Sequence, residues 1–146
     1  METILTIGDK RLVFAGESEI AWASERLGNV AWPADTCGLA IYQGERLAAV
    51  TLYNVFMGAS CSAHIVTDGR RDWANRGMLR GIFAFPFDHL DRRRITLPIA
   101  ERNVPAQVLA LKLGFRFEGR LLNSLEDDNE VIFGMLRENC IWIGRT

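Results

Sequence analysis

The chain has 146 residues, of which 49% are hydrophobic, and carries 17 Lys and Arg against 18 Asp and Glu. A chain of this size buries one core, so we expect a single domain over residues 1–146. The formal net charge of −1 excludes an overall attraction to nucleic acid or to an anionic membrane. No apolar run reaches the roughly 20 residues that span a bilayer, and the N-terminus lacks an export signal, so we expect a cytoplasmic protein.

Cysteine and histidine are too sparse for a metal site. The three cysteines are widely separated, and His64 and His89 are the only imidazoles. Neither the cysteines nor the histidines have the spacing of metal ligands, so we expect no structural metal.

The first half of the chain alternates short apolar runs with turn residues. Apolar residues at helical spacing predict one helix, which Gly28 ends. Runs rich in β-branched and aromatic residues, joined by links that contain glycine, are typical of antiparallel strands. We expect, in order, a strand at 11–15, a helix at 18–27, and strands at 39–43, 47–56 and 61–67.

The second half begins at the turn dipeptide Asp68-Gly69. Apolar residues then recur at helical spacing, but Pro86 lacks an N–H and should kink or end the regular helix. Pro98 has no N–H to donate to a neighbouring strand. Its strand should therefore lie at a sheet edge or beside a neighbour from which it separates. Asn103 is a good helix N-cap and Gly114 a good stop. We expect a helix at 73–90, a strand at 95–99, a helix whose Val108, Leu109 and Leu111 face inward, and strands at 115–121 and 131–136 across an acidic loop at 126–130.

Cationic side chains and glycines gather at the start of the long helix. Unpaired N–H groups at a helix N-terminus attract anions, and glycine allows a ligand to approach the backbone closely. This pattern predicts a pyrophosphate site, with a solvated arginine-rich surface as the alternative. The residues concerned are Arg70, Arg71, Arg76, Gly77, Arg80 and Gly81.

The segment from Asn103 to Gly119 carries a more specific pattern. Ala106 and Leu109 follow Asn103, and then come Lys112-Leu113-Gly114-Phe115 and Glu118-Gly119. This segment resembles the N-x-x-A-x-x-L-x-x-K-L-G-F-x-x-E-G signature of the GNAT N-acetyltransferase family, especially the branch of the ribosomal-protein N-acetyltransferases. The resemblance extends over about residues 61–137, and the order of elements fits the whole chain.

The resemblance implies a fold. We expect a single α/β domain of the α+β type, with a mixed, mostly antiparallel sheet flanked by helices. The strands around Ile65 and Leu97 should be parallel neighbours that splay apart at their C-terminal ends. Such an opening admits the cofactor in this family, and Pro98 suits a strand at its border.

The resemblance also implies acetyl coenzyme A as the cofactor. In the family, backbone groups of the strand before the long helix hold the pantetheine. Backbone N–H groups of the next loop and first helical turn hold the pyrophosphate, and an asparagine follows the next strand. The matching positions here are Ile65, Val66, Arg71, Arg76, Gly77, Met78, Leu79, Arg80 and Asn103.

Two positions depart from the family pattern. Leu79 stands at the second glycine of the usual phosphate loop, which weakens the expected affinity for the cofactor. Ala110 stands where many members carry the tyrosine that protonates the departing thiolate. Another group, or water, must then supply that proton.

Attack by an amine on a thioester requires a neutral amine, so a base or a water relay must remove its proton. His64 is the first candidate because it lies on the cofactor strand and imidazoles titrate near neutral pH. Glu101, beside Asn103, is the second candidate, and Tyr53 on the preceding strand is a third. Each could instead be structural.

These observations predict an N-acetyltransferase that moves an acetyl group from acetyl coenzyme A to a primary amine by direct attack in a ternary complex. The acceptor would be a small-molecule or protein amine, and the enzyme a monomer or homodimer. A non-catalytic acyl coenzyme A sensor and an unrelated nucleotide-phosphate binder are the alternatives. Acidic residues at 126–130 would favour a cationic acceptor, although they could equally form a solvated turn.

Overall fold

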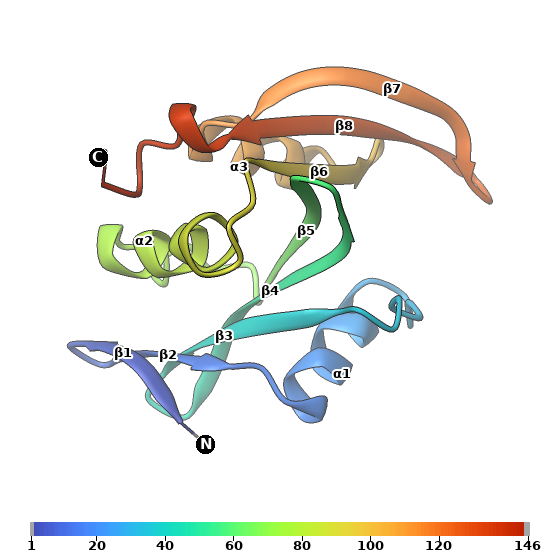
Figure 1. Cartoon of the computed structure of the whole chain (residues 1–146). Helices are drawn as coiled ribbons and strands as arrows, with labels where there is room; N and C mark the ends of the chain where they lie inside the picture. The colour runs from blue at the N-terminus through green and yellow to red at the C-terminus, as the bar shows by residue number, and fades with distance from the viewer. Residues whose placement is uncertain (1, 145–146) are drawn as a thin grey trace.

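A computed structural model describes residues 2–144 and shows one sheet of eight strands, in the order β1-β2-β3-β4-β5-β6-β8-β7 (Figure 1). The strands are β1 (Thr3–Ile7), β2 (Lys10–Phe14), β3 (Cys37–Gln43), β4 (Arg46–Met57), β5 (Ser60–Thr67), β6 (Arg94–Ala100), β7 (Arg116–Leu125) and β8 (Asp128–Leu136). The helices are α1 (Glu17–Arg26), α2 (Arg76–Ala84), a π-helical turn η1 (Phe85–His89), α3 (Val104–Leu113) and a 3₁₀ turn η2 (Arg137–Asn139).

The helices cover both faces of the sheet. On one face, α1 packs through Ala23 against Val13, Val50 and Leu52. The other face carries α2 and α3, whose buried residues share one core with alternate residues of the same strands (Figure 1). Neighbouring residues of a strand point to opposite faces, so both sides of the central strands are buried.

The predicted order of elements is confirmed, with one strand added at the N-terminus. The β1 strand was not expected, because it lies at the sheet edge and its residues are mostly exposed. It forms a hairpin with β2 through Gly8, whose φ of 61° lies in the left-handed region that glycine adopts without strain.

The long helix is shorter than predicted. It begins at Arg76, because the side chain of Asn75 caps it by accepting a hydrogen bond of 2.9 Å from the N–H of Met78. The regular helix ends at Ala84, and Pro86 lies in the π-helical turn that follows, which confirms the interruption expected at that proline.

Two expectations about the C-terminal part are wrong. Val108 and Leu111 are 39% and 56% exposed, because α3 faces the sheet with Ala110 and Leu113 instead. The acidic loop is also shorter, since β8 already begins at Asp128. The capping of α3 is as predicted: Asn103 accepts a hydrogen bond of 3.3 Å from Ala106 N–H, and Gly114 is left-handed.

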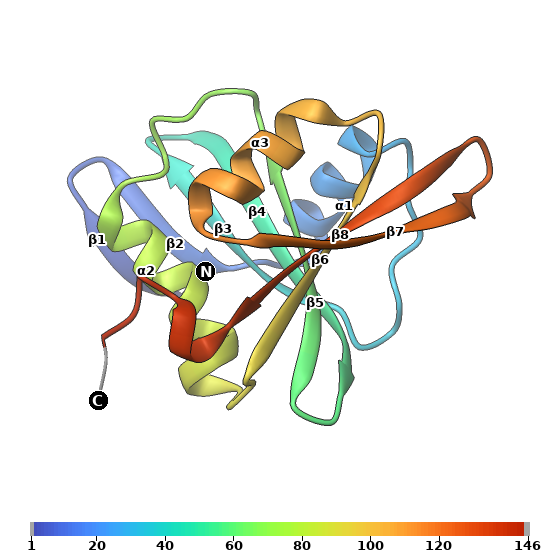
Figure 2. The same cartoon turned by 90° about the horizontal axis from the view of Figure 1, so that it is seen from above.

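The β5 and β6 strands are parallel neighbours that separate, as predicted. Their pairing ends at the pair Ser62 and Thr96, although β5 continues to Thr67 and β6 to Ala100. Figure 2 shows the two strands together at their beginnings and apart at their ends, where α3 starts. Beyond Ser62, the backbone groups of β5 that point away from β4 therefore have no strand partner within residues 2–144.

Candidate active site

A first cavity, of about 260 Å³, lies where β5 and β6 separate. It is bordered by the end of β5, the loop that leads to α2, the last turn of α1 and the first turns of α3. This cavity is called the basic cavity below. Its lining consists of Arg26, Leu27, Ile65, Val66, Thr67, Gly69, Arg70, Arg71, Trp73, Ala74, Asn103, Pro105, Ala106 and Leu109.

The basic cavity is lined by three arginines and, among residues 2–144, by no carboxylate. Arg26 stacks on Trp22, with its guanidinium carbon 4.9 Å from the ring centre, and its Nε donates to the carbonyl of Thr67 at 3.0 Å. The indole of Trp73 is buried and donates to the carbonyl of Arg70 at 2.9 Å, which holds the loop in place. The cavity therefore suits an anionic ligand.

Four of the nine residues expected at the cofactor line this cavity, namely Ile65, Val66, Arg71 and Asn103. The other five, on the first turns of α2, do not line it. Met78 and Leu79 have buried side chains, and their N–H groups bond to the side chain and the backbone carbonyl of Asn75.

The remaining three α2 residues also face elsewhere. A side chain on Gly77 would place its Cβ 2.0 Å from Cδ1 of Ile7, so this glycine allows β1 to approach the helix. Arg76 lies over the ring of Trp142 at 5.9 Å, and Arg80 is exposed on α2.

A second cavity, of about 540 Å³, adjoins the first, and the two share Leu27, Ile65, Asn103, Ala106 and Leu109. It extends towards the turn between β7 and β8 and is called the acidic cavity below. Its remaining lining is Gly28, Val30, Trp32, His64, Leu97, Pro98, Ile99, Ala100, Arg102, Ala110, Leu125, Glu126, Asp127 and Glu130.

Carboxylates dominate the charge of the acidic cavity, with Glu126, Asp127 and Glu130 against the single cation Arg102. That cation is already paired, because Nη1 of Arg102 lies 2.8 Å from Oδ2 of Asp127. The hydrogen bond to Arg102 holds the pKa of the Asp127 carboxyl below its usual range. With three acidic side chains against one basic side chain, the lining carries a net negative formal charge.

His64 lies in the wall of the acidic cavity, beside the residues shared by the two cavities. Burial lowers its pKa to about 4, so the imidazole is neutral at physiological pH. Its ring centre is 5.0 Å from that of Trp32, and no hydrogen bond fixes its nitrogens among residues 2–144. A neutral imidazole in this position is free to accept a proton.

The other two candidate bases do not face the cavity. Tyr53 is fully buried and hydrogen-bonded to the carbonyl of Ile82 at 2.7 Å, and burial raises its pKa far above the usual value. Glu101 accepts hydrogen bonds from Asn129 at 2.9 Å and forms an ion pair with Arg120 at 2.9 Å. Its carboxylate is thus engaged away from the cavity lining.

Ala110, at the position of the missing tyrosine, is buried and does line the acidic cavity. The methyl group that stands there cannot donate a proton, so this position offers no side-chain acid.

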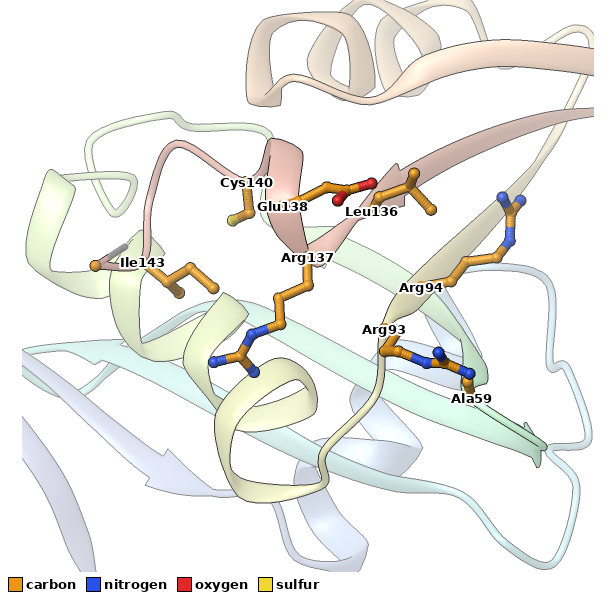
Figure 3. A pocket seen from close by; sticks show the side chains of 9 residues that line it. Ala59, Arg93, Arg94, Leu136, Arg137, Glu138, Cys140 and Ile143 are labelled. Atoms are coloured by element: carbon orange, nitrogen blue, oxygen red, sulfur yellow. The ribbon is translucent and has the colours of Figure 1, made fainter. Parts of the chain in front are cut away.

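A third cavity, of about 680 Å³, lies at the opposite end of β6 and β8, next to the beginning of β6 (Figure 3). Figure 3 shows the side chains of its Arg93, Arg94 and Arg137 pointing in different directions. Arg94 is paired with Glu118 at 3.0 Å and Arg137 with Asp88 at 2.6 Å. These cations do not converge on a common ligand.

Neither a metal site nor a membrane helix is found in the part of the chain that the structure describes. Within residues 2–144, no group of three or more His, Cys, Asp or Glu side chains is placed to hold a metal ion. No helix in that range has the length and apolar character needed to cross a membrane.

The architecture, with its splayed parallel strands in a mostly antiparallel sheet, is the GNAT-like fold of acetyltransferases. No family model matches the sequence, and no curated protein matches it. Among solved structures, a mutant of the spermidine N-acetyltransferase SpeG from Vibrio cholerae is similar with a TM-score of 0.70 and 13% identity, covering 90% of this chain and 96% of that chain.

Two further solved structures have the same fold. A structure described as mutant forms of the spermidine/spermine N-acetyltransferase SpeG from Vibrio cholerae gives a TM-score of 0.73 at 13% identity, over 90% of this chain and 96% of that chain. A probable acetyltransferase gives 0.73 at 11% identity, over 94% of this chain and 98% of that chain. The fold expected from the sequence is thereby confirmed.

Proposed function

We propose that this protein is an acetyl coenzyme A-dependent N-acetyltransferase that acts on a primary amine. One observation carries the proposal: two cavities of opposite charge adjoin at the opening between β5 and β6. An anionic acyl donor and a cationic acceptor would each meet the complementary charge, and their reacting groups would meet at the shared residues. The similar acetyltransferase structures support the same reading.

The basic cavity fits coenzyme A in the chemistry of its groups. Arg26, Arg70 and Arg71 would bind phosphates, since guanidinium groups match phosphate geometry with paired hydrogen bonds. The backbone of Ile65, on the edge of β5 that faces away from β4, would accept and donate hydrogen bonds to an amide-containing arm, and Val66 lines the same cavity. Acetyl coenzyme A supplies the thioester carbonyl that the amine attacks.

We assign the removal of the amine proton to His64. Although its pKa of about 4 makes it a weak base, the imidazole is fully deprotonated at pH 7. The proton of an attacking amine becomes much more acidic as its nitrogen forms the new bond, so a weak base suffices at that stage. His64 would accept this proton directly or through one water. Glu101 has no part in this assignment, because its carboxylate is held by Arg120 and Asn129.

A non-catalytic acyl coenzyme A binder is the second candidate, and Ala110 is the observation that favours it. Since Ala110 provides no acid in the acidic cavity, the departing thiolate would take its proton from water. A protein that only bound the cofactor would need neither that proton nor His64.

The proposal also covers the acceptor, the branch of the family, the location and the oligomeric state. The acceptor is a small-molecule or protein amine, and similar structures named for spermidine support a small molecule. The signature from Asn103 to Gly119 supports descent from the ribosomal-protein branch. We propose a cytoplasmic monomer or homodimer that binds neither nucleic acid nor membrane.

An assay of coenzyme A release separates the two candidates. The wild-type protein and an H64Q variant are mixed with acetyl coenzyme A and a panel of primary amines, and free thiol is measured. An enzyme releases coenzyme A only when an amine is present, and H64Q slows this release about 100-fold, as is typical when a general base is lost. Binding of acetyl coenzyme A without release for any amine would favour the binder.

A further inference from the structure

We infer that the acceptor is an aliphatic diamine or longer polyamine whose second ammonium group is bound by Glu126 and Glu130. This inference rests on the proposed function and assigns the acceptor to the acidic cavity. The carboxylates around the turn between β7 and β8 carry the argument. Some of them bond to other residues of the protein, and the others line the cavity without such a partner.

Four acidic residues surround this turn, namely Glu126, Asp127, Asp128 and Glu130, and two of them have hydrogen-bond partners within the protein. Asp127 forms an ion pair with Arg102 at 2.8 Å. Asp128 accepts a hydrogen bond of 3.0 Å from the backbone N–H of Arg102, and it does not line the cavity. Both hydrogen-bonding arrangements lower the pKa of these two carboxyl groups.

The other two carboxylates, Glu126 and Glu130, have no Lys or Arg nitrogen within 4.0 Å among residues 2–144. Both line the acidic cavity. Arg102, the cation that also lines it, is occupied by Asp127. The carboxylates left without an internal partner are thus the ones that a bound molecule can reach.

The turn that carries these carboxylates is fixed by hydrogen bonds. The side-chain oxygen of Asn129 accepts from the N–H of Asn123 at 2.7 Å, and its amide nitrogen donates to Glu101 at 2.9 Å. Glu130 follows Asn129 and pairs with Ala100 of β6 and Leu121 of β7. A carboxylate on a central strand is held more rigidly than one on a free loop, which favours a defined contact.

The charge state of the reacting amine explains why a second cation is needed. The amine that attacks must be neutral, so it cannot neutralise Glu126 and Glu130 during the reaction. A second ammonium group can remain charged, and its contact with Glu126 and Glu130 can hold the acceptor in the cavity. The same cavity is also lined by Leu97, Ile99 and Leu125, whose apolar side chains suit a chain of methylene groups.

The test compares pentylamine with 1,5-diaminopentane in the coenzyme A release assay. We expect the wild-type protein to show a kcat/KM at least about tenfold higher for the diamine, because charge-assisted contacts are the strong ones. In the double variant E126Q/E130Q the ratio of kcat/KM between the two amines should fall towards one, mainly through a higher KM for the diamine. Added salt should also reduce the preference.

Glu138→Gln is the matched control, since Glu138 is exposed beyond the other end of β8 and lines a different cavity. It removes the same charge and should leave the preference intact. Equal kcat/KM for the two amines, or an unchanged preference in a folded E126Q/E130Q variant, would overturn this inference alone. No release with either amine would overturn the proposed function and this inference with it.

Discussion

Replacing His64 by glutamine should flatten the pH dependence of stability below pH 6.5. Burial lowers the pKa of His64 from 6.5 to about 4 in the folded protein. Between these values the unfolded chain binds more protons than the folded one, so stability falls as the pH decreases. The contribution is fully present above pH 6.5 and is lost as the pH approaches 4. At pH 5 the linkage relation gives a loss of about 2 kcal/mol, and by pH 4 about 3 kcal/mol.

Urea unfolding of the wild-type protein and of H64Q at pH 7.5, 6 and 5 measures the contribution of His64 to the free energy of unfolding. Other groups titrate in both proteins, so the difference between their free energies of unfolding isolates His64. We expect that difference to move by about 2 kcal/mol in favour of H64Q between pH 7.5 and 5. A difference that stays constant over this range would refute the assignment of a half-buried, neutral imidazole at the cavity wall.

Three further substitutions test the placement of the site. Arg71→Gln should weaken acetyl coenzyme A binding about tenfold in calorimetry, because a charge-assisted contact is lost. Arg80→Gln on α2 should leave the affinity unchanged. Equal effects of the two substitutions would contradict the assignment of the basic cavity. Gly77→Val should destabilise the fold by about 1–3 kcal/mol, because the new side chain would collide with Ile7. Adding Ile7→Ala should recover part of this loss. An unchanged melting temperature in Gly77→Val would contradict the close contact between Gly77 and Ile7. Glu101→Gln should retain turnover within about threefold, and a loss of about 100-fold would restore Glu101 as the base.

The sequence alone predicted those features of the fold that depend on neighbouring residues. The cap at Asn103 and the stop at Gly114 depend only on neighbouring backbone groups, and both are found in α3. The parallel pair with its opening was predicted from the family resemblance, and Pro98 indicated the same seam. These features place the end of β5 beside the start of α3.

Features set by contacts between distant segments were missed. Arg26 reaches the basic cavity because its side chain bonds to Thr67, 41 residues away, and nothing in the last turn of α1 indicates this. At Gly77, a Cβ would meet Ile7 of a strand that was not expected, and nothing in the sequence indicated this packing contact. Local pattern cannot distinguish a ligand from a packed side chain at such a position.

Tyr53 illustrates a second limit of the sequence. Its strand position was predicted correctly, but the choice between the two faces of β4 depends on register. The observed register directs the ring into the core, where its hydroxyl bonds to the carbonyl of Ile82. Polar residues in the middle of a strand that is buried on both faces therefore give little information about a site.

Calorimetric titration of acetyl coenzyme A, followed by amine-dependent coenzyme A release from the same preparation, tests the central claim most directly. We predict that wild-type and H64Q proteins bind acetyl coenzyme A with nearly the same affinity, because His64 lines only the acidic cavity. Release should require an amine and should be about 100-fold slower in H64Q. Failure to bind acetyl coenzyme A, or binding without release for any amine, would contradict the account.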